Sequence, residues 1–375
     1  MVEGNEFTVH HLRFEAEALT PLALPAHAGP SIRGALWGAL QRHFCPLSER
    51  ETPDAGHKAV CPVCWLMATE KEGSGRGRDV PRPYTVEAPL RGVPGADWRP
   101  WRFGAGERFA FGLTLFAQAL NLFPYLVVAM PLMGQAGIGL SVDGGRRGRF
   151  VPRRVEAINP LTGATVTLMG EGQTSVRMPE APVTAGHVAE AAGALLGQVA
   201  EGGRVRLVFW TPTRIVDDGR LVHRPRLGPL VRRLLERLDA LRGEYAGEAP
   251  VAGREELVTL ADGARMVQDF TQWIDLESGS RRLGRSTPVG GFVGTATYET
   301  NRNLVLSEGA KANSVPNLEI LCDDVACGHG SSVGPPDEES LYYLMSRGLP
   351  RPAAMRLLIK GFFQEVIDRL PIGGM

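Results

Sequence analysis

Two features are scarce or missing in this sequence of 375 residues, and each absence excludes a class of protein. The chain has five cysteines, and an odd number in a chain of this length argues against a secreted disulfide framework. No N-terminal stretch combines the basic, apolar and small-residue parts of a signal peptide. We therefore expect a cytoplasmic protein.

An apolar run long enough to cross a membrane is also missing. The longest run covers residues 109–133 and is interrupted by Gln118, Asn121, Pro124 and Pro131. A membrane helix needs about 20 consecutive, predominantly apolar residues. We therefore expect no membrane partner.

The formal net charge is zero, so bulk charge gives no sign of a nucleic-acid partner. The charge is uneven, however: arginine dominates residues 146–154 and 204–242, and acidic residues gather in 323–339. Local basic strips matter more for phosphate binding than the net value. With 43% hydrophobic and 22% charged residues the chain can bury a core, and its length predicts two or three domains.

The order of the expected elements in the first half predicts an α+β fold. These elements are a strand over 7–19, a helix over 32–44 capped by Ser31, a strand over 103–116, a helix over 120–133 that stops near Pro131, and a basic hairpin over 137–155. Strand, helix, strand, helix and hairpin fit a ferredoxin-like sandwich.

The same pattern restarts after a polar, turn-rich segment at 159–182. The expected elements are a strand over 205–210, helices over 225–242 and 255–267, and strands over 270–276 and 291–298. The last helix and strand of this second copy do not follow. The sequence therefore predicts tandem ferredoxin-like domains: residues 1–180, with a Cys-rich insertion, and a truncated copy over 181–299.

The strand expected at 291–298 is followed at once by polar, turn-rich text from Asn301, with no linker between them. Natural domain boundaries usually fall in exposed, flexible linkers. We interpret this seam as a join, and a splice of two reading frames explains it better than a selected fusion. A second domain cut off in this way predicts exposed apolar surface around 292–298, and hence poor solubility.

Five motifs in the larger part carry a family resemblance. They are Gly29-Pro-Ser-Ile-Arg-Gly-Ala-Leu36, Cys61-Pro-Val-Cys64, Gly137-Ile-Gly-Leu140 with Gly148-Arg-Phe150, Thr211-Pro-Thr-Arg214 and Gly290-Gly-Phe-Val-Gly294. In their order and spacing, residues 7–298 resemble the CRISPR pre-crRNA-processing endoribonucleases of the RAMP superfamily. The resemblance implies tandem ferredoxin-like (RAMP/RRM-like) domains and metal-independent cutting of repeat RNA by 2′-hydroxyl attack. The family's C-terminal glycine-rich loop should follow Tyr298 and is missing, so we expect impaired cleavage.

The resemblance places a catalytic histidine near the first strand-to-helix turn or in the first helix. His27 in that loop and His43 at the helix end fit these places, and histidine can act as acid or base near neutral pH. We favour His27, because a loop of proline and glycine can expose it to RNA. The alternatives are an ordinary surface histidine at 27 and, at 43, a histidine that stabilises the helix end.

Arginines and glycine loops are the expected RNA contacts. The first set of arginines is Arg33, Arg146, Arg147, Arg149, Arg153 and Arg154, and the second is Arg281, Arg282 and Arg285. The alternative for each is a solvated basic face. CRISPR repeat RNA is the expected partner, together with other Cas proteins, and a non-catalytic crRNA-binding RAMP subunit is the alternative function.

Cys61 and Cys64 have the spacing of a zinc knuckle. Cys45 lies upstream within reach, and His57 could supply the fourth ligand. Three cysteines and one histidine form a legitimate structural zinc set. The alternative is a metal-free group of reduced thiols. RNA cleavage itself is expected to need no cofactor.

A second family resemblance begins at Asn301. It is carried by Asn301-Arg-Asn-Leu-Val-Leu-Ser-Glu-Gly-Ala310, Cys322-Asp-Asp-Val-Ala-Cys-Gly-His-Gly330 and Leu341-Tyr-Tyr-Leu-Met-Ser-Arg-Gly348. These stretches resemble the C-terminal end of SufB/SufD proteins, and the His-Gly version of the motif is more like SufD. Such proteins form the scaffold for iron–sulfur cluster assembly. The resemblance therefore implies a short end-piece of a β-helix over 300–375 and SufB/SufC-type partners.

The same resemblance implies that His329, and with it Cys327, lies at the subunit interface that holds a transient iron–sulfur cluster; thiolate and imidazole suit iron. We expect Asp337 to cap one C-terminal helix and residues 351–370 to form a second. Solenoid rungs stack on their neighbours. Nearly all preceding rungs are absent here, so we expect this tail not to work as a scaffold.

Overall fold

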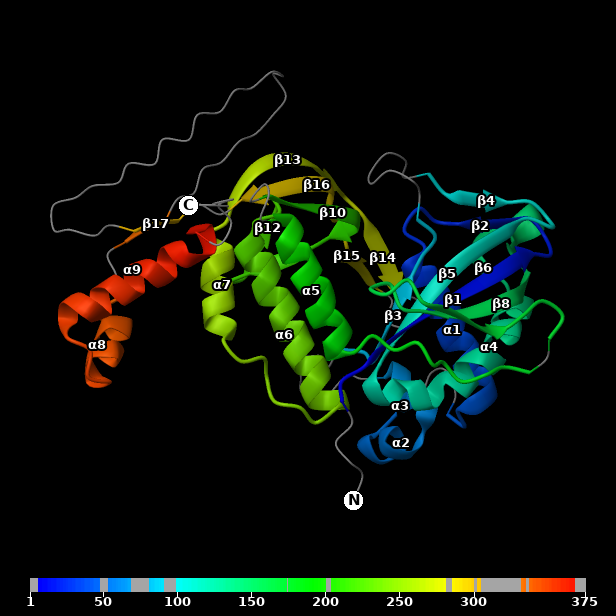
Figure 1. Ribbon diagram of the computed structural model, residues 1–375. Coiled ribbons are helices and arrows are strands. Elements are labelled where there is room, and N and C mark those ends of the chain that lie inside the picture. Colours follow the sequence, from blue (N-terminus) through cyan, green and yellow to red (C-terminus); the bar gives the residue numbers. More distant parts are fainter. Residues whose placement is uncertain are drawn as a thin grey trace, which may run out of the picture.

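The computed structural model describes residues 6–47, 53–68, 81–90, 99–173, 175–199, 204–280, 285–299, 302–304, 332–334 and 337–367. Figure 1 shows a sheet-rich N-terminal unit, a second unit in which helices lie along one sheet, and a pair of helices towards the C-terminus. The fold is α+β and its larger sheets are antiparallel, as predicted.

The main sheet of the N-terminal unit has the strand order β3-β5-β1-β8-β9, and neighbouring strands run antiparallel. Its strands are β1 (Val9–Ala18), β3 (Tyr84–Glu87), β5 (Arg108–Phe116), β8 (Phe150–Ile158) and β9 (Thr165–Met169). Buried residues alternate along β1, as expected for a strand with one face on a core. The helices α1 (Gly29–Phe44) and α4 (Phe123–Ala136) contribute to the same core.

Helix α1 begins earlier than predicted. Its N-cap is Ala28, which makes no side-chain cap, and a proline occupies the first turn, where an N–H would be unpaired anyway. Ser31 therefore does not cap the helix, and that prediction is wrong. The helix has an apolar face that lies in the core: Ile32, Leu36, Ala39 and Leu40 are all 0% exposed.

Helix α4 runs through Pro131 instead of ending there. A short 3-10 helix, η1 (Ala117–Leu122), leads into it, and Gly137 with a φ of +81° ends it. By length and composition alone the helical stretch Ala117–Ala136 could cross a membrane. One face of α4 nevertheless lies in the core: Phe123, Leu126, Met130 and Met133 are at most 2% exposed.

A second sheet of the N-terminal unit has the order β4-β2-β6-β7. Its strands are β2 (Leu22–Leu24), β4 (Trp101–Phe103), β6 (Ile138–Val142) and β7 (Arg146–Gly148), and a 3-10 turn, η2 (Asp143–Gly145), joins the last two. Gly139 has a φ of +80°, and a Cβ there would lie 2.0 Å from the carbonyl oxygen of Ala23. Only glycine allows so close an approach in this conformation. This glycine of the predicted RNA-binding loop therefore has a packing role.

An insertion between α1 and β3 contains two short helices, α2 (Ala55–Val60) and α3 (Pro62–Met67). The sequence predicted a cysteine-rich insertion here without its helices. Strand β9 was also missed, because it lies in the segment interpreted as a polar connection.

The second unit is built on a sheet of order β10-β16-β13. Its strands are β10 (Arg204–Thr213), β13 (Arg265–Ile274) and β16 (Gly291–Glu299); its helices are α5 (Ala185–Val199), α6 (Leu227–Tyr245) and α7 (Arg254–Asp262). Two hairpins join them, β11 (Ile215–Asp217) with β12 (Arg220–Val222) and β14 (Glu277–Ser280) with β15 (Arg285–Pro288). The helix predicted over 255–267 was too long, because Gly263 caps α7 and β13 begins two residues later.

Strand β16 is buried, so the prediction of exposed apolar surface at 292–298 is wrong. Phe292, Val293 and Ala296 are 0% exposed and Tyr298 is 3% exposed. The reason is that β10 and β13 pair with both edges of β16, and the Tyr298 hydroxyl donates to the carbonyl of Pro225 just before α6. Exposed apolar side chains occur instead on the flanking strands, at Val208, Trp210 and Phe270.

The C-terminal segment contains β17 (Arg302–Leu304), β18 (Ser332–Gly334), α8 (Glu338–Ser346) and α9 (Arg351–Ile367). β17 and β18 pair in parallel. Both predicted C-terminal helices are present, and Asp337 caps α8 by accepting hydrogen bonds from the N–H groups of Glu339 and Ser340.

Candidate functional site

A cleft of about 400 Å³ lies where α1, the start of β3 and α6 meet. Its charged and polar lining includes two residues that the sequence singled out, His27 and Arg33, and three that it did not, Arg82, Tyr84 and Arg237. Among the described residues that line this cleft, none is acidic. The cleft therefore favours an anion.

His27 is half-buried in the loop before α1. Desolvation, and then the charge of Arg33, lower the pKa of His27 below its usual value. The imidazole is therefore mostly neutral at pH 7, the form that can accept a proton. This is the protonation state that a general base needs.

Arg33, Arg82 and Arg237 come from three separate segments, and Arg237 is the contribution of α6. Arg33 and Arg237 are exposed enough to meet a ligand. Desolvation in the cleft, and then the charge of Arg82, lower the pKa of both, but a guanidinium stays charged at neutral pH. Three guanidinium groups that face one cleft without an acid are stabilised by a bound phosphate.

Tyr84 is 3% exposed, and its hydroxyl has no hydrogen-bond partner among the described residues. Burial raises the pKa of Tyr84 to about 12, so the phenol keeps its proton and remains a donor. A buried, unpaired hydroxyl costs free energy unless a ligand or water satisfies it. No motif marks this tyrosine in the sequence, because its role depends on where α6 and α1 lie.

The structure separates the two histidine candidates. His43 is exposed in the last turn of α1, and its ring centroid lies 6.4 Å from that of Phe44. His27 precedes the other end of this helix of 16 residues, which spans about 24 Å. The two cannot serve one reaction centre, and His43 does not line the cleft.

The predicted arginines of the basic hairpin lie outside the cleft lining. Arg153 is paired with Glu17 at 2.9 Å and Arg154 with Glu156 at 3.4 Å. Arg146, Arg147 and Arg149 are exposed and form no ion pair within the part of the chain that the structure describes. Arg281 and Arg282 lie outside the described residues, and so does the side chain of Arg285.

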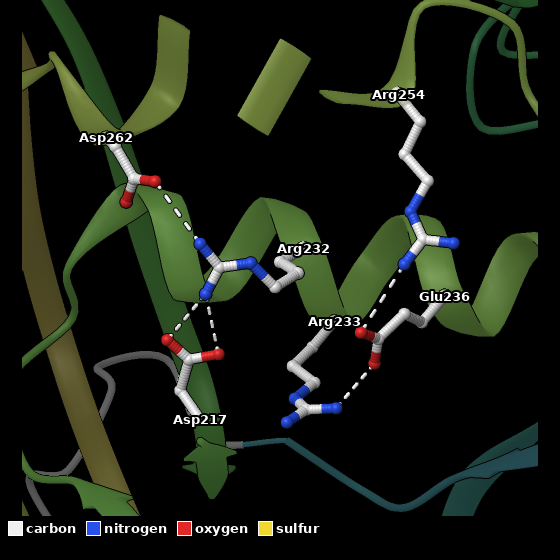
Figure 2. Close-up of polar contacts among 6 residues, drawn as sticks. All are labelled: Asp217, Arg232, Arg233, Glu236, Arg254 and Asp262. Carbon is white, nitrogen blue, oxygen red and sulfur yellow. Dashed lines mark hydrogen bonds and ion pairs between the residues drawn. The ribbon is translucent and has the colours of Figure 1, made fainter. Parts of the chain in front are cut away.

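Three of the four arginines of α6 pair with acids, and Figure 2 shows two of them, Arg232 and Arg233. Arg232 lies 2.6 Å from Asp217 and 3.2 Å from Asp262. Arg233 and Arg254 share Glu236. Arg242 pairs with Glu248. The arginines of α6 are therefore largely paired, and Arg237 is the one that reaches the cleft. The arginines of the expected strip that precede α6, such as Arg206, Arg220 and Arg224, are exposed.

The structure brings together the four predicted zinc ligands, Cys45, His57, Cys61 and Cys64, named here the Cys₃His cluster. Their donor atoms all lie within 4.8 Å of one another. Both Cys61 and Cys64 are buried, and all three cysteines are free thiols. Thiolate and imidazole donors in a closed set of four are the chemistry of structural zinc. Cys327 and His329, the predicted cluster-assembly residues, lie outside the described residues.

Two family models match separate parts of the chain. A family model named AF_1859_N, described as an N-terminal domain, matches residues 7–181. A second model, described as the SufBD core domain of SUF system FeS cluster assembly, matches residues 291–362. The first match covers His27, Arg33 and Tyr84 but not Arg237, and the second begins inside the second unit, at β16.

Curated relatives match the C-terminal part. An iron-sulfur cluster assembly SufBD family protein of Mycobacterium tuberculosis is 52% identical over 80 residues, which are 21% of this chain and 20% of that protein. The iron-sulfur cluster assembly protein SufD of Bacillus subtilis is 49% identical over 77 residues, 20% of this chain and 18% of that protein. The chain thus spans about a fifth of the length of these relatives. The predicted likeness to SufD is confirmed.

Solved structures that resemble the larger part are CRISPR proteins. A Thermus thermophilus Cas6 aligns with a TM-score of 0.39 and 15% identity, over 79% of this chain and 85% of that one. A RAMP protein binding different RNA substrates aligns with a TM-score of 0.36 and 10% identity, over 78% and 88%. The chain is thus similar to SufD proteins in its C-terminal part, and Cas6 and RAMP structures align with its larger part.

Proposed function

We propose that the cleft between α1, β3 and α6 binds RNA, and that His27 cuts it without a metal. The observation that carries this proposal is the neutral imidazole of His27 beside three guanidinium groups, in a cleft with no acid among its described lining residues. CRISPR repeat RNA is the proposed substrate, with other Cas proteins as partners. The proposed location is cytoplasmic.

The proposed reaction is an internal transfer of the phosphodiester. His27 takes the proton of a 2′-hydroxyl, and the resulting 2′-oxygen attacks the adjacent phosphorus. The bond from phosphorus to the 5′-oxygen breaks, that oxygen takes a proton from water, and His27 releases its proton to solvent, which leaves a 2′,3′-cyclic phosphate and a 5′-hydroxyl. The cleft arginines stabilise charge on the phosphate as it develops, and the Tyr84 hydroxyl can donate a hydrogen bond to it.

Replacing His27 tests catalysis against binding. His27→Ala should lower the cleavage rate of repeat RNA by about 10²–10⁴-fold at pH 7 and leave RNA affinity unchanged. His43→Ala, in the last turn of α1 and away from the cleft, is the matched control and should cut like the wild type. Binding by the wild type without any cutting would support the alternative of a non-catalytic crRNA-binding RAMP subunit.

Arg237 tests whether the cleft is the binding site. Arg237→Ala should weaken RNA binding and reduce the dependence of log affinity on log salt by about 0.7, the value for one lost phosphate contact on a single strand. Arg232→Ala on the same helix removes a charge that is already paired with Asp217 and should leave the salt dependence unchanged. Equal effects of the two would contradict a binding site in the cleft. The exposed Arg146, Arg147 and Arg149 are proposed as further contacts, as are Arg281, Arg282 and Arg285.

The proposed architecture is a tandem of ferredoxin-like domains, 1–180 and 181–299, followed by a SufD-like segment, 300–375. In the first unit, β1, α1, β3, β5, α4 and β8 follow one another, with sheet order β3-β5-β1-β8, as in a βαββαβ sandwich. In the second, β10, α6, β13 and β16 with order β10-β16-β13 supply the first three strands only. Among the residues that the structure describes, no fourth strand of this sheet follows β16, and this supports a truncated second domain with impaired activity.

A second candidate function is favoured by the 52% identity to a SufBD family protein. The C-terminal segment would then contact SufB- or SufC-type proteins and hold a transient iron–sulfur cluster through Cys327 and His329. Co-purification of SufB or SufC with the full chain, lost when residues 300–375 are removed, would support it. We propose that the join itself is a splice; amplification of codons 290–310 from source DNA as one continuous frame would overturn that.

A further inference from the structure

The Cys₃His cluster has the dimensions of a tetrahedral metal site. The Sγ atom of Cys45 lies 3.5 Å from Nε2 of His57 and 3.7 Å from Sγ of Cys64. Zinc bonds of about 2.3 Å to sulfur and 2.0 Å to nitrogen separate tetrahedral ligands by roughly 3.6–3.8 Å. The sulfurs are too far apart for a disulfide, whose S–S bond is about 2.05 Å.

The helix that carries His57 lacks another reason to hold its place. α2 and α3 have six residues each, but α3 buries Val63, Cys64, Leu66 and Met67 in the core, whereas α2 buries no side chain. Helices much shorter than about 12 residues are marginal on their own, and most helices in proteins are held by an apolar face. The carboxylate of Asp54 accepts the backbone N–H of His57 at 2.7 Å, which positions α2 locally but does not attach it to the core. A metal bond through His57 supplies that attachment.

Helix α3 in turn contacts both the cleft and α6. The Trp65 ring meets the ring of Tyr245 edge-on, with centroids 5.5 Å apart. The Tyr245 hydroxyl donates to the carbonyl of Pro81 at 2.7 Å. In the next residue, Arg82, Nε donates to the carbonyl of Met67 at the end of α3, at 3.3 Å. Thus α3 contacts α6 through Trp65, and its last residue accepts a hydrogen bond from Arg82, one of the cleft arginines.

We propose that the Cys₃His cluster binds one zinc ion, and that this ion fixes α3 so that Trp65 holds α6 against the N-terminal unit. The ion is structural, because all four ligands come from the protein and the set is closed. The same anchoring sets the position of Arg82. The proposal does not depend on RNA cleavage, since zinc binding and the packing of α6 can each be measured without RNA.

Metal content of the full chain tests the site. Protein purified under reducing conditions should hold about one zinc ion per chain. After removal of the metal with a chelator, Co²⁺ should give the visible absorption of a tetrahedral thiolate site, and Zn²⁺ should displace it. Cys61→Ser/Cys64→Ser should lose the zinc and the Co²⁺ signal, whereas Cys322→Ser/Cys327→Ser removes the same number of thiols and should keep both.

The metal-free wild type is itself tested for binding of Co²⁺ and Zn²⁺. The result therefore does not depend on whether the cysteine variants fold. Reduced wild type that binds neither Zn²⁺ nor Co²⁺ would overturn the site. Iron with acid-labile sulfide that persists in the Cys322→Ser/Cys327→Ser variant would overturn zinc as the metal.

Hydrogen exchange tests the link to α6. Removing zinc should speed amide exchange in α3 and in the last turn of α6, around Tyr245, by about tenfold or more. Trp65→Ala should keep its zinc and still show the faster exchange in α6. Unchanged exchange at Tyr245 in the zinc-free protein, or in Trp65→Ala, would overturn the role of α3 as a support while leaving the metal site intact.

Discussion

The N-terminal unit and the segment after β16 differ in how their residues are buried. In the N-terminal unit, two helices and two sheets enclose one continuous core that includes the fully buried side chains of Phe14, Phe123 and Phe150. In the described part of the C-terminal segment, Leu341 and Ala354 are the buried apolar residues, one on each helix of the pair α8 and α9. A core of this size cannot stabilise a separate domain.

The curated relatives of high sequence identity match the C-terminal part of the chain, not the N-terminal unit with the larger core. The match at 52% identity is to a SufBD family protein, and the SufBD family model covers α8 and most of α9, where the described residues bury few apolar side chains. A solenoid rung is recognisable by its sequence but is stable only when stacked on its neighbours, and about four-fifths of the length of the relatives has no counterpart here. The comparison shows that a family signature and an independent core are separate properties of a chain.

Strand β16 belongs both to the second unit, by its pairing, and to the region that matches the SufBD family model. The SufBD match begins at residue 291, so it includes the strand that forms the centre of the other unit's sheet. Its pairing partners, β10 and β13, lie before the match. Strand pairing needs a suitable apolar pattern more than a particular ancestry, and β16 supplies one.

The largest expected effect comes from truncating a buried side chain of β16. Phe292 is 0% exposed and meets Phe209 edge-on at 4.9 Å, so Phe292→Ala should destabilise the second unit by about 3–5 kcal/mol. Leu341→Ala, at a residue that is also 0% exposed, should leave the main unfolding transition in place, because it empties only the small core of α8 and α9. Thermal unfolding followed by circular dichroism measures both. A main transition lowered equally by Leu341→Ala would break the distinction between the regions.

Features of the fold could be predicted from the sequence where residues close together in the chain determine them. The apolar face of α1, with Ile32, Leu36 and Leu40, follows from helical spacing alone. The Cys61–Cys64 pair follows from chelate spacing, and its two further ligands lay close in sequence. Ser31 failed as a cap because the helix starts earlier, with a proline in its first turn, and capping preferences cannot decide between two adjacent starts.

The cleft could be predicted only in part, because its lining residues come from segments that are far apart in the sequence. His27 and Arg33 come from a motif around one turn. Tyr84 and Arg237 lie 153 positions apart in the numbering and become neighbours only when α6 packs beside β3. The burial of β16 was missed for the same reason: its two partner strands, β10 and β13, precede it in the chain and pair with both its edges.

A smaller effect is expected from two glycines with positive φ, one in each region. At Gly139 an added Cβ meets the Ala23 carbonyl oxygen, so Gly139→Ala should cost about 1–3 kcal/mol for the clash on top of about 1–2 kcal/mol for the left-handed conformation. Gly348 follows α8 with a φ of +93° and open space around it, so Gly348→Ala should cost the conformational part alone. Denaturant titration of the main transition should report Gly139→Ala and be insensitive to Gly348→Ala. A shift of that transition by Gly348→Ala would show that the tail is coupled to the body.

The smallest effect is expected from single ion pairs on the surface of the two regions. Arg254 joins α7 to α6 through Glu236 at 3.4 Å and Asp239 at 3.2 Å. Because these groups are partly exposed and screened by salt, Arg254→Ala should cost about 0.2–1 kcal/mol at low salt and less at high salt. Arg351 joins α9 to α8 through Glu338 at 3.1 Å, with both side chains more exposed, and Arg351→Ala should leave the main transition unchanged. Urea titrations at two salt concentrations separate these cases. A cost for Arg254→Ala that does not fall with salt would mean that the network in Figure 2 acts through side-chain packing, and not through charge.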